Sequence, residues 1–449
     1  MQRIELPKSS RLLTPDFTFG VATAAFQVEG ATQADGRLPS IWDDFCAIEG
    51  RVKNGDSGMP ACDHYHRWQE DLELIQGLGV DAYRLSIAWP RVMTKDGQAN
   101  ARGLDFYKRL LDSLLERCIT PFVTLYHWDL PQHLQERGGW LNRDTAYRFQ
   151  EYADLVSREF GDRVHSYATL NEPWVSAILG HEVGIHAPGL EDARLARQAG
   201  HHLLLAHGLG MQALRANVPD AQAGLVLNMG PNTPHSRRYD DRVAALVGEA
   251  SMNHWFLEPV LEGRYPALYT RLYPEQAPQV LPGDMALISQ PVDFVGINYY
   301  TRSVVSYDEQ RLVKDHPPED VEVTDFGWEV YPQGLTDLLV DLNAQYRLPP
   351  LMVTENGMAG DDRLVEGEVH DEQRCRYLNS HLNAVHEAIE QGVDVRGYFA
   401  WSLMDNFEWA EGYSKRFGMV YIDYETQRRT LKDSAKAFAD FLWARQARR

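Results

Sequence analysis

Short apolar runs alternate along the chain with longer segments in which hydrophobic residues recur every three or four positions. This alternation is typical of βα units, in which helices connect parallel strands. Eight of the apolar runs are predicted to be strands, at residues 19–28, 82–89, 121–127, 167–171, 224–229, 294–300, 351–355 and 397–402. Eight parallel strands are the number that a closed (β/α)8 barrel requires, so we predict the α/β class and a single TIM barrel.

Three segments between these runs show the helical period clearly. Apolar side chains three or four positions apart lie on one face of a helix, where they pack against the sheet. We expect three buried stripes, formed by Tyr65, Trp68, Leu72 and Ile75, by Tyr107, Leu111, Leu114 and Cys118, and by Phe149, Tyr152, Val156 and Phe160. No Pro-, Gly- or Ser-rich linker interrupts the pattern, so we predict one domain over residues 1–449.

Composition and charge exclude several classes of partner. Hydrophobic residues make up 44% and charged residues 24% of the 449, which is the balance of a soluble globular protein. The net charge of −20 repels phosphate groups, so we expect no nucleic-acid and no anionic-membrane partner. The chain begins without an apolar stretch of signal-peptide length and has no run of roughly 20 apolar residues, which predicts a cytoplasmic protein.

The cysteines and paired histidines do not have the spacing of metal ligands. Cys46, Cys62, Cys118 and Cys375 are scattered without a C-x-x-C pair, so we expect free thiols rather than disulfides or a zinc site. The histidine pairs at 64/66 and 201/202 point their rings apart on predicted helices, which indicates packing or surface roles. We therefore predict no metal.

Polar and aromatic residues gather at the predicted carboxyl ends of the strands. In a barrel of this type, the loops that follow those ends converge on one face and form the active site. Hydroxyl groups of a sugar need convergent donors and acceptors, while the apolar face of its ring lies against an aromatic side chain, so this mixture favours a sugar ligand. The residues concerned are Gln27, His127, Trp128, Asn171, Glu172, Asn298, Tyr300, Glu355, Trp401, Glu408 and Trp409.

Two of these residues are glutamates in matching settings. Glu172 and Glu355 each end an apolar run, one within TLNEPW at 169–174 and the other within VTENG at 353–357. Glycoside hydrolysis needs two carboxyl groups, because the departing oxygen must be protonated while an anion meets the positive charge that develops at the anomeric carbon. The pair therefore predicts a glycoside hydrolase.

The chain also resembles glycoside hydrolase family 1, the β-glucosidase family, over essentially its whole length. The resemblance rests on the order and spacing of many motifs together. They are FTFGVATAAFQVEG at 17–30, PSIWD at 39–43, CDHYH at 62–66, YRLSIAWP at 83–90, YHWDLP at 126–131, TLNEP at 169–173, GINYY at 296–300, TENG at 354–357 and WSLMDNFEW at 401–409.

The resemblance implies a role for each matching residue. Glu172 would be the acid/base and Glu355 the nucleophile of a retaining hydrolase, with carboxyl groups roughly 5 Å apart. Arg84 and Tyr300 would lie beside Glu355, where a cation and a hydroxyl donor favour the ionised carboxylate. Asn298 would support the same centre.

The remaining residues would bind the sugar and its leaving group. Trp401 would form the floor under the ring, and Trp128 and Trp328 would form the outer wall against the leaving group. The hydroxyls of the nonreducing sugar would be held by Gln27, His127, Asn171, Glu408 and Trp409. The implied enzyme is an exo-acting β-glucosidase of cello-oligosaccharides and aryl or alkyl glucosides, with no cofactor.

Several alternatives stay open. Epimers at the 4-hydroxyl can both reach Gln27 and Glu408, so a broader β-galactosidase or β-fucosidase uses the same residues, as does a transglycosylase. A non-catalytic sugar-binding barrel is disfavoured because both carboxylates are present. A 6-phospho-β-glycosidase is disfavoured because Glu408 places an anion beside the 6-hydroxyl, and Lys415 is predicted to be an exposed surface lysine. The sequence leaves the oligomeric state open.

Overall fold

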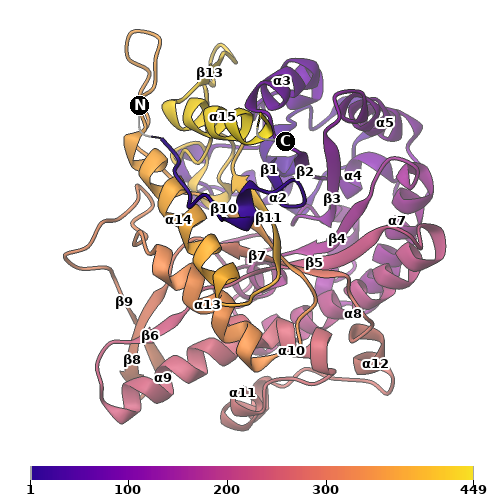
Figure 1. Cartoon of the computed structure of the whole chain (residues 1–449). Helices are drawn as coiled ribbons and strands as arrows, with labels where there is room; N and C mark the ends of the chain where they lie inside the picture. Colours follow the sequence, from indigo (N-terminus) through magenta and orange to yellow (C-terminus); the bar gives the residue numbers. More distant parts are fainter. Residues whose placement is uncertain (1–2, 448–449) are drawn as a thin grey trace.

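The computed structural model describes residues 3–447, and its centre is a closed barrel of eight parallel strands (Figure 1). The order around the barrel is β1-β11-β10-β7-β5-β4-β3-β2, and β1 pairs with both β2 and β11 to close it. The strands are β1 (Thr18–Ala22), β2 (Ala82–Ser86), β3 (Thr120–Tyr126), β4 (Ser166–Asn171), β5 (Gln222–Asn228), β7 (Phe294–Tyr299), β10 (Leu351–Asn356) and β11 (Val395–Trp401). The predicted barrel is thereby confirmed.

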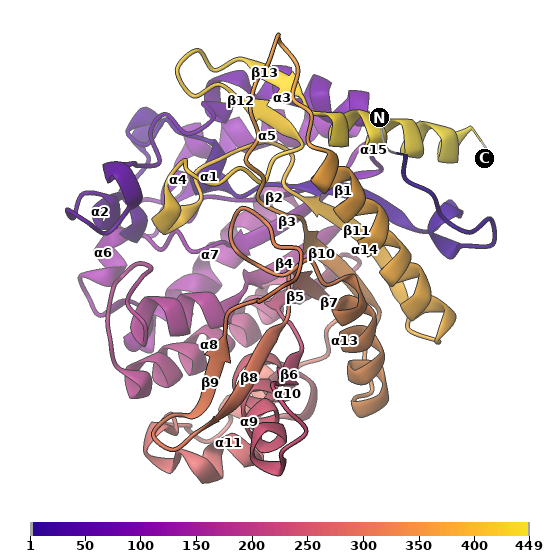
Figure 2. The same ribbon diagram turned by 90° about the vertical axis from the view of Figure 1, so that its left-hand side faces the viewer.

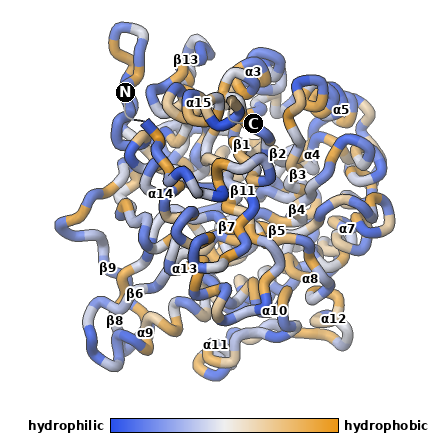
Figure 3. Tube along the Cα trace, viewed as in Figure 1, coloured by the Kyte–Doolittle hydropathy of each residue, from blue (hydrophilic) through white to orange (hydrophobic). Residues whose placement is uncertain are grey.

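Helices surround the barrel and bury the outer faces of its strands (Figures 1 and 2). The main ones are α3 (His64–Leu78), α5 (Ala101–Glu116), α7 (Asp144–Phe160), α8 (Ala193–Asn217), α10 (Trp255–Glu262), α13 (Pro332–Gln345), α14 (Glu372–Glu390) and α15 (Asp433–Gln446). The strands are buried along almost their whole length, as is usual for parallel sheets. Figure 3 accordingly colours much of β7 and α8 as hydrophobic.

Shorter elements lie in the connections. They are α1 (Ala25–Val28), α2 (Ile41–Cys46), α4 (Trp89–Val92), α6 (Gln132–Gln135), α9 (Tyr239–Glu249), α11 (Ala267–Leu272) and α12 (Asp284–Ile288). Two small sheets stand outside the barrel, one of β6 (Asn232–Pro234), β8 (Ser303–Asp308) and β9 (Leu312–His316), the other of β12 (Val420–Ile422) and β13 (Arg429–Leu431) (Figure 2).

The first strand is shorter than predicted. We expected residues 19–28 to be extended, but β1 ends at Ala22 and the chain turns into the short helix α1. The hydroxyl of Ser86, at the end of β2, accepts a hydrogen bond of 2.7 Å from the backbone N–H of Ala25 and so fixes this turn. Gln27 consequently lies on α1, beyond the strand end, and its side chain is fully buried.

The predicted helix stripes on α3 and α7 are buried throughout, and so are the α5 members Tyr107, Leu111 and Leu114. Cys118 is the exception, because it is exposed and lies outside the helix. Its backbone takes a left-handed φ of 58° between the end of α5 at Glu116 and the start of β3 at Thr120. The chain reverses there, so the helical period no longer applies. All four cysteines are free thiols in the structure.

None of the helices within residues 3–447 combines the length and the apolar character needed to cross a membrane.

Candidate active site

The carboxyl ends of the strands bring Glu172 and Glu355 into one buried network. Glu172 follows the last residue of β4 directly, and Glu355 is the penultimate residue of β10. Only 6% of Glu172 and 3% of Glu355 is exposed. Two carboxyl groups at this depth need specific partners, because burial disfavours an ionised group that is not compensated.

Glu355 has two strong hydrogen-bond donors. Arg84, on β2, donates from Nη1 to Glu355 Oε1 at 2.6 Å, and Tyr300, just after β7, donates from its hydroxyl to Oε2 at 2.7 Å. Both donors favour the ionised carboxylate. The positions predicted for Arg84 and Tyr300 beside Glu355 therefore agree with the structure.

Glu172 is held by an amide instead of a cation. Asn298 donates from Nδ2 to Glu172 Oε1 at 2.5 Å and to Asn171 Oδ1 at 3.1 Å. The hydroxyl of Thr354 donates to Asn298 Oδ1 at 2.7 Å, which fixes the orientation of that amide. Asn171 Oδ1 also accepts from Arg84 Nη2 at 2.7 Å, so one guanidinium is shared between the two sides of the site.

These contacts give the two carboxyl groups different acidities. Burial and the charge of nearby Glu355 together raise the pKa of Glu172 to about 8, although the hydrogen bond from Asn298 opposes the shift. Burial also raises the pKa of Glu355, but the charge and hydrogen bond of Arg84 and the hydroxyl of Tyr300 lower it. The arrangement favours a protonated Glu172 beside an ionised Glu355, which is the pairing that acid-assisted displacement at an anomeric carbon needs.

Three residues at this face have strained backbones. Glu172, Trp128 and Trp409 adopt left-handed φ angles of 47°, 78° and 50°. Such conformations cost a residue with a side chain about 1–3 kcal/mol and persist where the surrounding structure enforces them, as at active sites. Hydrogen bonds hold the side chains of Glu172 and Trp128, the latter through the 2.9 Å bond from its Nε1 to the carbonyl of Asn171, and ring contacts with Trp42 and Trp128 hold that of Trp409.

The residues predicted to hold sugar hydroxyls leave polar atoms without partners. Gln27 Oε1, His127 Nδ1 and Glu408 Oε2 are buried and make no hydrogen bond within the protein. Buried polar atoms in folded proteins nearly always have partners, so these three atoms are available to a polar ligand. Burial, together with the charges of Glu355 and Glu411, raises the pKa of Glu408 to about 8.

His127 is a neutral hydrogen-bond donor toward the site. Burial and the charge of Arg84 hold its pKa well below the usual range. Its Nε2 lies 3.2 Å from Nδ2 of Asn171, whose amide donates, so the ring proton is assigned to Nδ1. The orphaned Nδ1 can therefore donate to a ligand oxygen.

Aromatic rings line the same face. The ring of His127 is nearly parallel to those of Trp401 and Trp409, at centroid distances of 5.9 Å and 6.1 Å. Trp128 packs against Trp409 at 4.6 Å. Trp328 lies in the connection between β9 and α13, with its ring centroid 5.5 Å from that of Tyr300, the residue whose hydroxyl donates to Glu355.

The prediction for Lys415 is wrong. Only 18% of its side chain is exposed, and Nζ donates to the carbonyl of Asp325 at 2.5 Å and to its carboxylate at 3.0 Å. The loop that carries Phe326 and Trp328 supplies this partner from 90 positions away, so the sequence around Lys415 could not reveal it.

Two further residues of the site were not singled out from the sequence. Thr354 fixes Asn298, and Asn406 Oδ1 accepts a hydrogen bond of 3.0 Å from Nε2 of Gln27. Both lie within motifs that carry the family resemblance, but neither has a carboxylate or an aromatic ring that marks a functional residue. Their roles become visible only through their partners.

The sequence also matches a family model. The model for glycosyl hydrolase family 1 covers residues 9–446. The chain belongs to this family. It is therefore a glycoside hydrolase.

Relatives within glycosyl hydrolase family 1 match over nearly their full lengths. Beta-glucosidase A of Thermotoga maritima is 48% identical, covering 93% of this chain and 95% of the relative. The bifunctional beta-D-glucosidase/beta-D-fucosidase of Bifidobacterium breve is also 48% identical, covering 96% and 98%. A solved structure of the T. maritima beta-glucosidase in complex with deoxynojirimycin has a TM-score of 0.94 at 46% identity, covering 96% of this chain and 98% of that chain.

Across residues 3–447, no group of three or more His, Cys, Asp or Glu side chains is arranged to hold a metal ion.

The unequal acidity of the two carboxyl groups can be measured directly. We expect the carboxyl carbon of Glu172 to titrate near pH 8 in the wild-type protein by ¹³C NMR, because burial and the charge of Glu355 both disfavour its ionisation. In Glu355→Gln the like charge is gone, so the pKa of Glu172 should fall. An unchanged titration in the variant would contradict the coupling of the pair.

Proposed function

We propose that the protein is a retaining, exo-acting β-glucosidase that hydrolyses terminal nonreducing β-D-glucosyl residues of short oligosaccharides and of aryl or alkyl glucosides. The observation that carries this proposal is the contrast between the two buried carboxyl groups. Glu355 is bonded by the Arg84 guanidinium and the Tyr300 hydroxyl, whereas burial raises the pKa of Glu172 to about 8. The names of the T. maritima and B. breve relatives support the substrate class.

In the first step, an oxygen of Glu355 forms a bond to the anomeric carbon as the glycosidic bond breaks. The electron pair of that bond leaves with the departing oxygen, which receives the proton of Glu172. Arg84 and Tyr300 keep Glu355 ionised and aimed until it reacts. Asn298 holds Glu172 through its 2.5 Å bond to Oε1.

In the second step, water attacks the anomeric carbon and the bond to Glu355 breaks. Glu172, now ionised, accepts a proton from this water, so the two carboxyl groups return to their starting states. A sugar hydroxyl in place of water gives transglycosylation by the same residues. Two displacements at one carbon retain its β configuration.

The sugar subsite is proposed to consist of the residues with orphaned polar atoms and their aromatic neighbours. Gln27 Oε1 and Glu408 Oε2 accept from hydroxyls, and His127 Nδ1 donates to one. Asn171 and Trp409 complete the polar set, and Trp401 forms the floor under the ring. Trp128 and Trp328 form the wall beside the leaving group.

A broader specificity is the second candidate. It rests on the B. breve relative, which is named for both β-glucosidase and β-fucosidase activity and is 48% identical. The glucan glucohydrolase names of other relatives, 47% identical in one case, favour a role in the degradation of cellulose-derived oligosaccharides. Three further points stay predictions. They are a single catalytic domain over residues 1–449, a cytoplasmic location and independence from cofactors.

The two catalytic roles predict different kinetic effects of substitution at Glu355 and at Glu172. Glu355→Gly should lower turnover of p-nitrophenyl β-glucoside by at least about 10³-fold, because no glycosyl-enzyme can form. Glu172→Gln should spare the first step for this good leaving group and slow the second step and poor leaving groups by about 10²–10⁴-fold. Single-turnover and steady-state kinetics separate the steps.

Exposed Glu116 offers a matched control, since Glu116→Gln should keep wild-type rates. Near-normal turnover by Glu355→Gly would contradict the role of Glu355 as nucleophile.

The position of Glu408 also predicts that the enzyme cleaves 6-phosphoglucosides poorly. A 6-phosphate would bring a negative charge into a buried site beside the Glu408 carboxyl, and Lys415 is already bonded to Asp325 and so is not free to compensate that charge. An uncompensated contact of this kind costs several kcal/mol, so p-nitrophenyl β-glucoside should be cleaved about 10³-fold better than its 6-phosphate, as measured by kcat/KM. Glu408→Ser should weaken the first activity without creating the second. Equal or better cleavage of the phosphorylated substrate would place the protein among phospho-glycosidases.

A further inference from the structure

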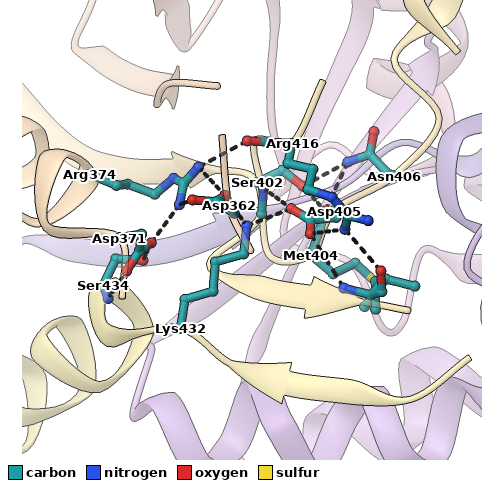
Figure 4. Close-up of polar contacts among 12 residues, drawn as sticks. Asp362, Asp371, Arg374, Ser402, Met404, Asp405, Asn406, Arg416, Lys432 and Ser434 are labelled. Carbon is teal, nitrogen blue, oxygen red and sulfur yellow. Dashed lines mark hydrogen bonds and ion pairs between the residues drawn. The ribbon is translucent and has the colours of Figure 1, made fainter. Parts of the chain in front are cut away.

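A row of buried ion pairs includes Asp405, in the loop that follows β11 (Figure 4). Asp362 accepts from Arg374 Nη2 at 2.7 Å and from Lys432 Nζ at 2.5 Å. Lys432 Nζ also donates to Asp405 Oδ1 at 2.7 Å, and Asp405 Oδ2 accepts from Arg416 Nη1 at 2.6 Å. The row thus connects α14, the residue before α15 and the loop after β11.

The charges in this row depend on one another. Asp405 and Lys432 are both fully buried, and ions at that depth are tolerated only when paired. Asp405 also accepts from the backbone N–H of Gly418 at 3.0 Å, and its own N–H donates to the carbonyl of Val420 at 2.9 Å. Both its side chain and its backbone are therefore fixed, which sets the position of the next residue, Asn406.

The amide of Asn406 has one orientation. Nδ2 donates to the hydroxyl of Ser402 and to the carbonyl of Met404, both at 3.0 Å. Oδ1 consequently faces Gln27 and accepts from its Nε2 at 3.0 Å. A flipped Asn406 would place its oxygen against the carbonyl oxygen of Met404 and its amide hydrogens against those of Gln27.

Asn406 in turn sets the amide of Gln27. Nε2 of Gln27 donates to Asn406 Oδ1 and to the carbonyl of Phe407 at 2.9 Å, which uses both of its hydrogens. Only Oε1 is left for a ligand, and it is buried without a partner. Gln27 can therefore serve a sugar as an acceptor alone.

We propose that Asn406 and the Lys432–Asp405 ion pair behind it are positioning residues, which act on the sugar through the amide of Gln27. The charged row fixes Asn406, and Asn406 fixes the acceptor that Gln27 presents. None of the three needs to touch substrate. The inference rests on the proposed β-glucosidase function and adds to it the device that orients one side of the sugar subsite.

A double-mutant cycle tests the proposal. Gln27→Ala and Asn406→Leu should each lower kcat/KM for p-nitrophenyl β-glucoside by about 10- to 100-fold, as loss of a hydrogen bond to a buried group does. If Asn406 acts through Gln27, the double variant should lose no more than about twofold beyond Gln27→Ala. Losses that multiply would overturn the proposal, because they would mean that Asn406 acts independently of Gln27.

Lys432→Met extends the cycle to the ion pair. It should lower the midpoint of thermal unfolding and, at a temperature where circular dichroism shows it folded, lower kcat/KM in the wild-type background but not in Gln27→Ala. Lys436→Met is the matched control, since Lys436 lies on the same segment with its side chain 36% exposed, and it should leave kcat/KM unchanged. An equal loss from Lys432→Met in both backgrounds would contradict the role of the ion pair.

Ser402→Ala removes only one hydrogen-bond acceptor of Asn406. It replaces Asn406→Leu and Lys432→Met in the test if those variants do not fold. It should cost about threefold in kcat/KM, again only when Gln27 is present. The two proposals can fail separately. A wild-type protein inactive on β-glucosides would contradict the proposed function, whereas an active enzyme with multiplicative losses would contradict only the positioning role.

Discussion

The guanidinium of Arg84 connects the two sides of the site, and the rest of the chemistry depends on it. It donates to Glu355 at 2.6 Å and to Asn171, the neighbour of Glu172, at 2.7 Å. Only 2% of Arg84 is exposed, so its charge requires a carboxylate partner in the interior. Because that partner is Glu355, ionisation is favoured on one side of the site, and burial keeps the proton on the other.

The closed barrel makes this contact possible. Arg84, Asn171, Asn298 and Glu355 come from four different strands, whose carboxyl ends meet at one face because all eight are parallel. Each of these side chains has a fixed orientation, because its donors and acceptors form hydrogen bonds with its neighbours. Polar atoms of Gln27, His127 and Glu408 stay unused within the protein, and these are the atoms that we propose bind the sugar.

Most of the fold and the central pair of the site could be predicted, because they depend on local pattern. Strand periodicity, helix stripes and strand-end glutamates are all visible within a few residues. The departures involve partners that are distant in sequence. Gln27 lies on a helix because of Ser86, and Lys415 is half-buried because of Asp325. Asn406 matters through Gln27, 379 positions away, which no local pattern reveals.

The stereochemical course tests the central claim most directly. Glu355 as nucleophile implies two displacements at the anomeric carbon, whereas direct attack by water implies one. ¹H NMR of the first glucose released from p-nitrophenyl β-glucoside, recorded before mutarotation, distinguishes them. We expect the β-anomer to appear first and the α-anomer to follow slowly. Initial release of the α-anomer would contradict the assignment of Glu355 and the account built on it.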